Sequence, residues 1–182
     1  MDKSKTRAGI AGPSVSEHVN SKRLGKQLSD LYAIHAPAVV RLAYLLTGEE
    51  EAARDICQEA FVRVGGRLGG LRDPEKVPAY LFRTVVNLSR GHGRALKRER
   101  RLLEKLPRFN TQAAPDTGRH DELMHALITL PPRQRAAIFL RYYLDLPEVQ
   151  AAEVLNSSMS ALKSLVHRAL KTLRDELKED TE

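Results

Sequence analysis

The sequence predicts an all-α protein made of two small helical domains joined by a flexible linker. Apolar residues recur at three- and four-residue steps through most of the chain, whereas no stretch shows a convincing strand alternation or hairpin dipeptide. A segment without this period, residues 107–120, separates the two periodic halves. The chain has 182 residues, and about 90 residues suffice for a three- or four-helix unit with its own core.

These patterns divide the chain into five parts. We expect a disordered basic tail over residues 1–26, a first domain over 27–106, the linker over 107–120, a second domain over 121–178 and a disordered C-terminus over 179–182.

Three helices are expected in the first domain. The first starts near Leu28, and Pro37 should kink or divide it. The second starts after Thr47-Gly48 with three glutamates, which suit the positive end of a helix dipole, and should end or fray at the glycines of residues 65–70. The third begins at Asp73-Pro74 and carries an apolar stripe over residues 77–88.

Proline and turn residues place the helices of the second domain. Leu123 to Leu130 form one helix, which Pro131-Pro132 end, and the second of these prolines opens another that runs to about Tyr143. Two more helices are expected over residues 147–155 and 159–177.

Charge and composition exclude several classes of protein. Lys and Arg number 30 against 23 Asp and Glu, a net charge of +7, which favours a polyanionic partner. The single cysteine, Cys57, cannot form an internal disulfide, and no apolar run approaches the roughly 18 residues of a membrane span. The chain also lacks a phosphate-binding glycine loop and a metal-ligand spacing. We therefore expect a cytoplasmic protein that is not an enzyme, with no cofactor, metal, membrane association or small-molecule substrate.

A helix-turn-helix is the most informative local pattern. A short helix, the turn Asn156-Ser157-Ser158 and a longer helix follow one another, with Ser158 placed as the N-cap of the longer one. Small and cationic side chains face outward on that helix, as major-groove and phosphate contacts require. These residues are Ser160, Ala161, Lys163, Ser164, His167, Arg168 and Lys171. An ordinary helical hairpin with a solvated basic face explains the same pattern.

Aromatic and basic residues also gather on the third helix, where a strongly basic run starts at Arg90. Aromatic rings beside cations can hold unstacked bases. The residues concerned are Tyr80, Phe82, Arg83, Asn87 and Arg90. The simpler interpretation is that the rings lie in the core or at its boundary and the charges form a solvated helix face.

The order of these motifs resembles the sigma-70 family of bacterial RNA polymerase sigma factors, in its extracytoplasmic-function (ECF) subfamily and close to an actinobacterial sigma-E-like group. The similarity runs from about Leu28 to Leu177. Three stretches of the first domain resemble region two of the family: RLAYLLTG (41–48), DICQEAF (55–61) and PAYLFRTVVNL (78–88). Three stretches of the second domain resemble region four: LPPRQRA (130–136), LRYY (140–143) and LKSLVHRAL (162–170). Tryptophan is frequent in the family where this chain has Gly65 and Leu68.

The resemblance implies a transcription initiation factor that binds core RNA polymerase and directs it to promoter DNA. Asp55, Gln58, Glu59 and Phe61 match the motif that docks on the clamp helices of the polymerase β′ subunit. Tyr80, Phe82, Arg83 and Asn87 match the segment that captures a flipped base of the minus-ten element, and Lys163, Ser164, His167 and Arg168 match the helix that reads the minus-thirty-five element. The polymerase β flap and a cognate anti-sigma factor are further expected partners.

Two other functions fit the same sequence. One is a DNA-binding regulator that uses only the helix-turn-helix and needs no polymerase. The other is a sigma-like interaction module that binds polymerase or a regulator without supporting initiation.

Overall fold

The protein folds entirely into helices over the part of the chain that its computed structural model describes, residues 15–70, 73–103 and 126–179. The helices are α1 (Val15–Thr47), α2 (Glu50–Gly65), α3 (Val77–Leu103), α5 (Pro132–Ile138), α6 (Glu148–Val154) and α7 (Met159–Glu179). Residues 126–129 are also helical. The predicted all-α class with two helical domains is confirmed, whereas the predicted linker, residues 107–120, lies outside the described residues.

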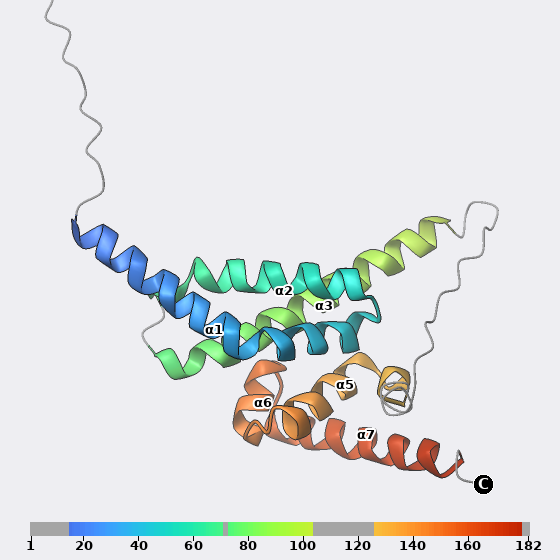
Figure 1. The fold of residues 1–182 in the computed structure, drawn as a ribbon. Coiled ribbons are helices and arrows are strands. Elements are labelled where there is room, and N and C mark those ends of the chain that lie inside the picture. The colour runs from blue at the N-terminus through green and yellow to red at the C-terminus, as the bar shows by residue number, and fades with distance from the viewer. Residues whose placement is uncertain (1–14, 71–72, 104–125, 180–182) are drawn as a thin grey trace, which may run out of the picture.

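The first domain is a bundle of α1, α2 and α3 (Figure 1). Its core consists of apolar side chains at helical spacing on all three helices, including Leu42, Leu45, Val64, Leu81 and Val85. Proline is tolerated in α1, which runs through Pro37 without being divided. Proline has no N–H, so α1 loses one backbone hydrogen bond at Pro37, whose ring is exposed. Packing of the helix before and after Pro37 keeps α1 continuous.

The start of α1 differs from the prediction. The sequence predicts disorder over residues 1–26, but α1 already begins at Val15, so that prediction is wrong for residues 15–26, and residues 1–14 lie outside the described part. The reason lies at the end of α2, where a Cβ added at Gly65 would meet Leu28 Cδ2 at 3.0 Å and one at Gly69 would meet Leu24 Cδ1 at 3.7 Å. Because glycine has no side chain, α1 can pack closely against this region, and α1 therefore extends further toward the N-terminus than predicted.

The helix boundaries of the first domain follow local signals. Gly48 has φ +77° and ends α1, and its N–H donates a hydrogen bond to the Tyr44 carbonyl at 2.7 Å. The predicted end of α2 at the glycines is confirmed, since the helix stops at Gly65. Asp73 Oδ1 accepts a hydrogen bond from the Glu75 N–H at 3.1 Å and caps the short turn that leads into α3.

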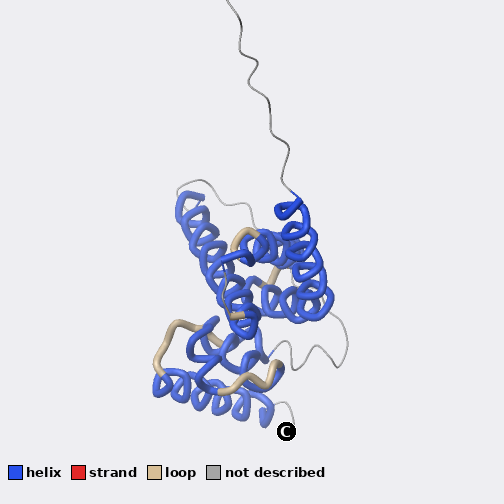
Figure 2. Tube along the Cα trace, turned by 90° about the vertical axis from the view of Figure 1, so that its left-hand side faces the viewer, coloured by secondary structure: helices blue, strands red, loops and turns tan. Residues whose placement is uncertain are grey.

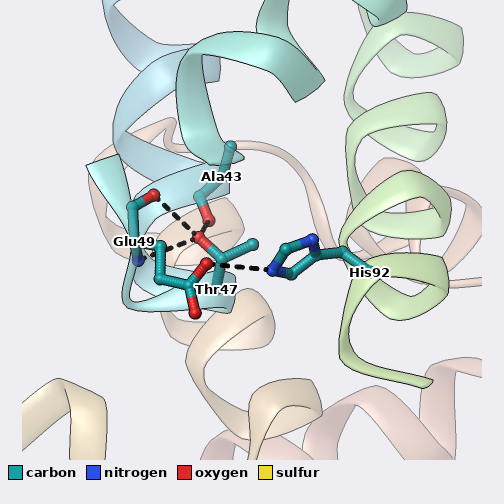
Figure 3. Close-up of polar contacts among 4 residues, drawn as sticks. All are labelled: Ala43, Thr47, Glu49 and His92. Carbon is teal, nitrogen blue, oxygen red and sulfur yellow. Dashed lines mark hydrogen bonds and ion pairs between the residues drawn. The ribbon is translucent and has the colours of Figure 1, made fainter. Parts of the chain in front are cut away.

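A polar cluster fixes the α1–α2 connection to α3 (Figure 3). The Thr47 hydroxyl donates to the Ala43 carbonyl at 2.9 Å and accepts from the Glu49 N–H at 3.3 Å. Glu49 Oε2 in turn lies 3.3 Å from His92 Nε2 on α3. This cluster places the start of α2 beside the middle of α3.

In the second domain, α5 and α6 pack on the long helix α7. A π-helical turn, Phe139–Tyr143, continues α5 as predicted, and the hairpin of α6 and α7 forms the predicted helix-turn-helix. Buried apolar side chains hold this unit together, among them Ile138, Leu155, Leu162 and Leu173. No described helix is long and apolar enough to cross a bilayer.

The two domains are packed against each other, an arrangement that we call the closed arrangement (Figure 2). One continuous apolar cluster includes buried side chains of both domains. Arg135 of α5 donates hydrogen bonds to the Leu45 carbonyl near the end of α1 and to the Leu130 carbonyl. Arg41 of α1 donates to the Tyr143 hydroxyl at 2.8 Å. The sequence predicts the two domains but not this contact between them.

Candidate nucleic-acid interface

The outer face of α2 combines polar side chains with an apolar groove. Asp55, Gln58 and Glu59 are all exposed, at the spacing that places them on one helix face. The predicted contact residue Phe61 is only 5% exposed, and its ring lies 4.8 Å from that of Tyr32 on α1. Phe61 therefore contributes the floor of the surface rather than a protruding anchor.

The groove itself lies between α1 and α2 and has a volume of about 700 Å³; we call it the docking groove. Leu28, Tyr32, Phe61 and Val62 are among its lining residues. Tyr32 is 54% exposed and Val62 62% exposed, which is unusual for side chains of this kind. Sequence reasoning missed both, although Val62 follows Asp55 and Gln58 at helical spacing and could have been found there.

A second hollow, of about 770 Å³, opens where α2 ends beside α3; we call it the Tyr80 hollow. It contains the predicted residues Tyr80, Arg83 and Asn87 and two arginines that the sequence did not single out, Arg63 and Arg67. The guanidinium carbons of Arg67 and Arg83 lie 5.6 and 5.4 Å from the centre of the Tyr80 ring. An aromatic face bordered by cations suits a stacked base with its phosphate nearby.

Phe82 is a core residue in this structure and does not lie on the surface that contains Tyr80. Its side chain is 2% exposed and packs edge-on against His35 at 5.8 Å. Burial in this apolar contact lowers the pKa of His35. The simpler interpretation, that the rings are core or boundary aromatics, fits the buried Phe82; Tyr80 is half-buried against the core and also lines the hollow.

Arg90 also lies apart from the other predicted minus-ten residues. It lines a separate cavity between α3 and α5 and is not among the residues of the Tyr80 hollow. In the closed arrangement Arg90 lies beside Arg133 of the second domain, so its predicted contact with minus-ten DNA stays a prediction.

The helix-turn-helix presents its predicted surface to solvent. The Ser158 hydroxyl accepts a hydrogen bond from the Ala161 N–H at 3.1 Å, which confirms the predicted N-cap of α7, and Asn156 adopts a left-handed φ of 48° in the turn. The side chains predicted to face DNA are all exposed: Ser160, Ala161, Lys163, Ser164, His167, Arg168 and Lys171. Lys163 Nζ lies 3.3 Å from Glu148 Oε2, so a contact with phosphate would compete with this ion pair.

The described residues contain no group of three or more His, Cys, Asp or Glu side chains that could hold a metal ion. Cys57 is 4% exposed, and burial raises the pKa of its thiol, as fits the structural thiol expected from the sequence. The chemistry available on these surfaces is recognition of anionic and aromatic groups.

Comparison with known proteins matches both domains to one family. The family model for Sigma-70 region 2 matches residues 31–99, and that for Sigma-70, region 4 matches residues 120–173. The RNA polymerase sigma-E factor of Streptomyces avermitilis is 35% identical over 143 residues, which cover 77% of this chain and 79% of that protein. The ECF RNA polymerase sigma factor SigW of Bacillus subtilis is 24% identical over 182 residues, which cover 91% of this chain and 97% of that protein.

The fold has solved counterparts as well. The sigma factor RpoE of Bartonella quintana, whose structure was solved in complex with the anti-sigma factor NepR, matches with a TM-score of 0.69 at 22% identity. The match covers 84% of this chain and 98% of that chain, and at this identity it concerns the fold alone.

Proposed function

Because the chain belongs to the sigma-70 family of RNA polymerase sigma factors, we propose that each of its three exposed surfaces performs one recognition step of transcription initiation. The protein is an ECF-type sigma factor, which binds core RNA polymerase and directs promoter-specific initiation. Factors of this family have no enzymatic activity of their own, since the polymerase performs the chemistry. Each of the three surfaces therefore serves recognition rather than catalysis.

The first assignment is that the α2 face and the docking groove bind the clamp helices of the polymerase β′ subunit. Exposed Asp55, Gln58 and Glu59 border an apolar groove in which Tyr32 and Val62 are also exposed. Apolar side chains surrounded by polar ones form the common anatomy of a protein interface. A cognate anti-sigma factor that covered the same groove would compete with core polymerase.

On the second domain, exposed Tyr142 and Val149 offer apolar contacts for the β flap.

The second assignment is that the Tyr80 hollow holds a flipped base of the minus-ten element. Stacking is worth about 1–3 kcal/mol per base, comparable with the few kcal/mol needed to extract a base from a duplex. The arginines beside Tyr80 would meet the adjoining phosphates, and Asn87 can hydrogen-bond a base edge. The observation that carries the proposal is the Tyr80 ring with the guanidinium groups of Arg67 and Arg83 close to it.

The third assignment is that α7 reads the minus-thirty-five element in the major groove. Ser160, Ala161 and Ser164 near its N-terminus are small and exposed, and exposed Arg168 and Lys171 follow along the helix. Small side chains let a helix approach base edges, while cations fix its register on the phosphates.

The test is run-off transcription with purified core polymerase on promoter fragments. We expect Asp55→Ala combined with Gln58→Ala to weaken core binding at least tenfold, and Tyr80→Ala to preserve core binding but reduce open-complex formation measured by permanganate reactivity. Glu75→Ala removes an exposed carboxylate of the same domain outside both surfaces and should leave both steps unchanged. Normal open complexes with Tyr80→Ala would contradict the role of the hollow.

A salt titration tests the third surface. Arg168→Ala should lower the dependence of the logarithm of upstream-element affinity on the logarithm of salt concentration by about 1, whereas Lys22→Ala on α1 should not change it. Equal slopes for Arg168→Ala and the unmodified protein would argue against α7 as the reading helix. Operator binding without polymerase would instead favour a polymerase-independent regulator, and core binding without transcripts would favour an interaction module.

A further inference from the structure

A cavity of about 300 Å³ lies between the two domains, and none of the three proposed surfaces uses it; we call it the interdomain cavity. Its walls come from α3 of the first domain, α5 of the second and the end of α1. One half is apolar, formed by Leu46, Val86, Pro132 and Ala136.

The other half of the interdomain cavity is cationic. Arg90, Arg94 and Lys97 of α3 line it together with Arg133 of α5. Among the described residues, none of these side chains lies within ion-pair distance of a carboxylate. The cavity therefore gathers positive charge from both domains without a balancing negative charge in the described part of the chain.

Arg90 shows this imbalance at the level of single atoms. Its Nη2 atom and the nearby Ser89 hydroxyl are buried and have no hydrogen-bond partner among the described residues. Burial, followed by repulsion from Arg133 and Arg94, lowers the pKa of Arg90. Arg90 itself is only partly buried, but a buried donor atom without a partner is costly, and an anion placed here would satisfy it.

We propose that the interdomain cavity binds an organic anion that carries at least two negative charges on a flat apolar body, the chemical class of a nucleoside diphosphate. Its phosphates would bridge Arg90 and Arg133, which belong to different domains, while the base would lie against the apolar half near Leu46 and Val86. The volume lies at the lower end of the range for small-molecule sites, about 300–1,000 Å³. Bound in this way, the ligand stabilises the closed arrangement. The proposal is independent of the proposed polymerase and DNA surfaces.

Calorimetric titration of the full chain tests the site with four probes: ADP, GDP, pyrophosphate and adenosine. We expect saturable binding of at least one nucleotide, binding of pyrophosphate at least tenfold weaker and no binding of adenosine. Equal affinity for pyrophosphate and the nucleotides would overturn the role assigned to the apolar half. Absence of binding by both nucleotides would overturn the proposal.

Arg90→Met provides the sharpest variant because it keeps the apolar stem and removes the unpartnered charge. Without ligand, its melting temperature should rise, since a buried guanidinium nitrogen without a partner is removed, whereas its nucleotide affinity should fall at least tenfold. Arg98→Gln is the matched control, an exposed arginine of α3 that does not line the cavity, and it should leave the affinity within twofold. A comparable loss in Arg98→Gln would show attraction to a basic chain rather than a site and would overturn the proposal.

Gly93 offers an independent test that needs no ligand. It lines the cavity, and a Cβ added there meets nothing within 4 Å, so a longer side chain can enter the cavity. Gly93→Glu introduces a tethered carboxylate, whereas Gly93→Gln fills the same space without charge and has a similar helix propensity. The melting temperature of Gly93→Glu should exceed that of Gly93→Gln.

The same pair of changes at Gly91 controls for charge effects along the helix, because Gly91 has open space around it but does not line the cavity. The difference between Glu and Gln should be larger at position 93 than at position 91. Equal differences at the two positions would mean that the cavity cations need no anion, and the proposal would fail.

Discussion

At the scale of single residues, Tyr80 and Phe82 show how two neighbouring aromatic rings take opposite roles. Successive residues of an α-helix turn by about 100°, so two positions bring a side chain almost to the opposite face. Tyr80 therefore lines the hollow while Phe82 is 2% exposed in the core. Helical geometry alone could have separated the two rings, because Phe82 lies between Val85 and Val86 around the helix, on the side that packs against α1.

Arg90 illustrates what the sequence could not provide. Its basic neighbours made a DNA contact plausible, but Arg90 lines a cavity together with Arg133, which lies beyond the predicted linker in the other domain. Two residues so far apart in the sequence produce no motif that sequence analysis could detect. Arg63 and Arg67 were not predicted for a different reason, since the glycines beside them indicate a helix end rather than a binding surface.

His35 makes stability depend on pH. Burial lowers its pKa in the folded state, so the unfolded chain binds a proton at a higher pH than the folded chain does. The free energy of unfolding should therefore fall as pH decreases from about 7 through the ordinary histidine range near 6.5. His35→Gln should reduce this slope in denaturant titrations between about pH 7 and pH 5.5.

The matched control for this measurement is His167→Gln, the same change at an exposed position of α7. A slope in His35→Gln equal to that of the unmodified chain would contradict the role of the buried ring.

At the scale of secondary-structure elements, helix ends were the features that sequence could predict. Asp73 before Pro74, Ser158 before α7 and the glycines after α2 act through hydrogen bonds and backbone freedom within a few residues, and all lie where they were expected. The early start of α1 was not predictable in this way. Residues 15–26 carry no apolar period of their own, and their order depends on Leu24 and Leu28 meeting glycines at the far end of another helix.

Gly48 gives the element-scale prediction. Its φ of +77° closes α1 and starts the turn to α2. The left-handed conformation costs an L-residue roughly 1–2 kcal/mol, so Gly48→Ala should lower the free energy of unfolding by about that amount in denaturant titrations. Gly70→Ala is the control, because Gly70 has no positive φ and a Cβ there meets nothing within 4 Å. A loss as large in Gly70→Ala as in Gly48→Ala would contradict this account.

At the scale of the whole molecule, the closed arrangement rests on few polar contacts. Arg135 joins the domains through the Leu45 carbonyl, which lies in the last turn of α1 where carbonyls lack helical donors. Burial lowers the pKa of its guanidinium, which remains a cation at neutral pH. Because the arginine lies after the predicted linker and its acceptor lies before it, the two domains were predictable from the sequence but their contact was not.

Arg135→Met should weaken the closed arrangement while keeping most of the buried apolar volume. Hydrogen bonds from charged groups contribute about 1.5–3 kcal/mol, so we expect a lower melting temperature and a larger radius of gyration in small-angle X-ray scattering. Arg54→Met is the control, since Arg54 pairs with Glu50 on the surface of α2. An unchanged radius and melting temperature in Arg135→Met would show that apolar packing alone holds the domains together.

The burial of Cys57 has a practical consequence. It is the only cysteine of the chain, it is 4% exposed, and it lies in the wall of the docking groove. A thiol reagent can therefore modify the native protein only when α1 and α2 separate enough to admit it. The labelling rate then measures how often α1 and α2 separate, and no engineered probe is needed. A partner seated in the groove would slow the reaction, so this one sulfur atom can serve as a native sensor of occupancy.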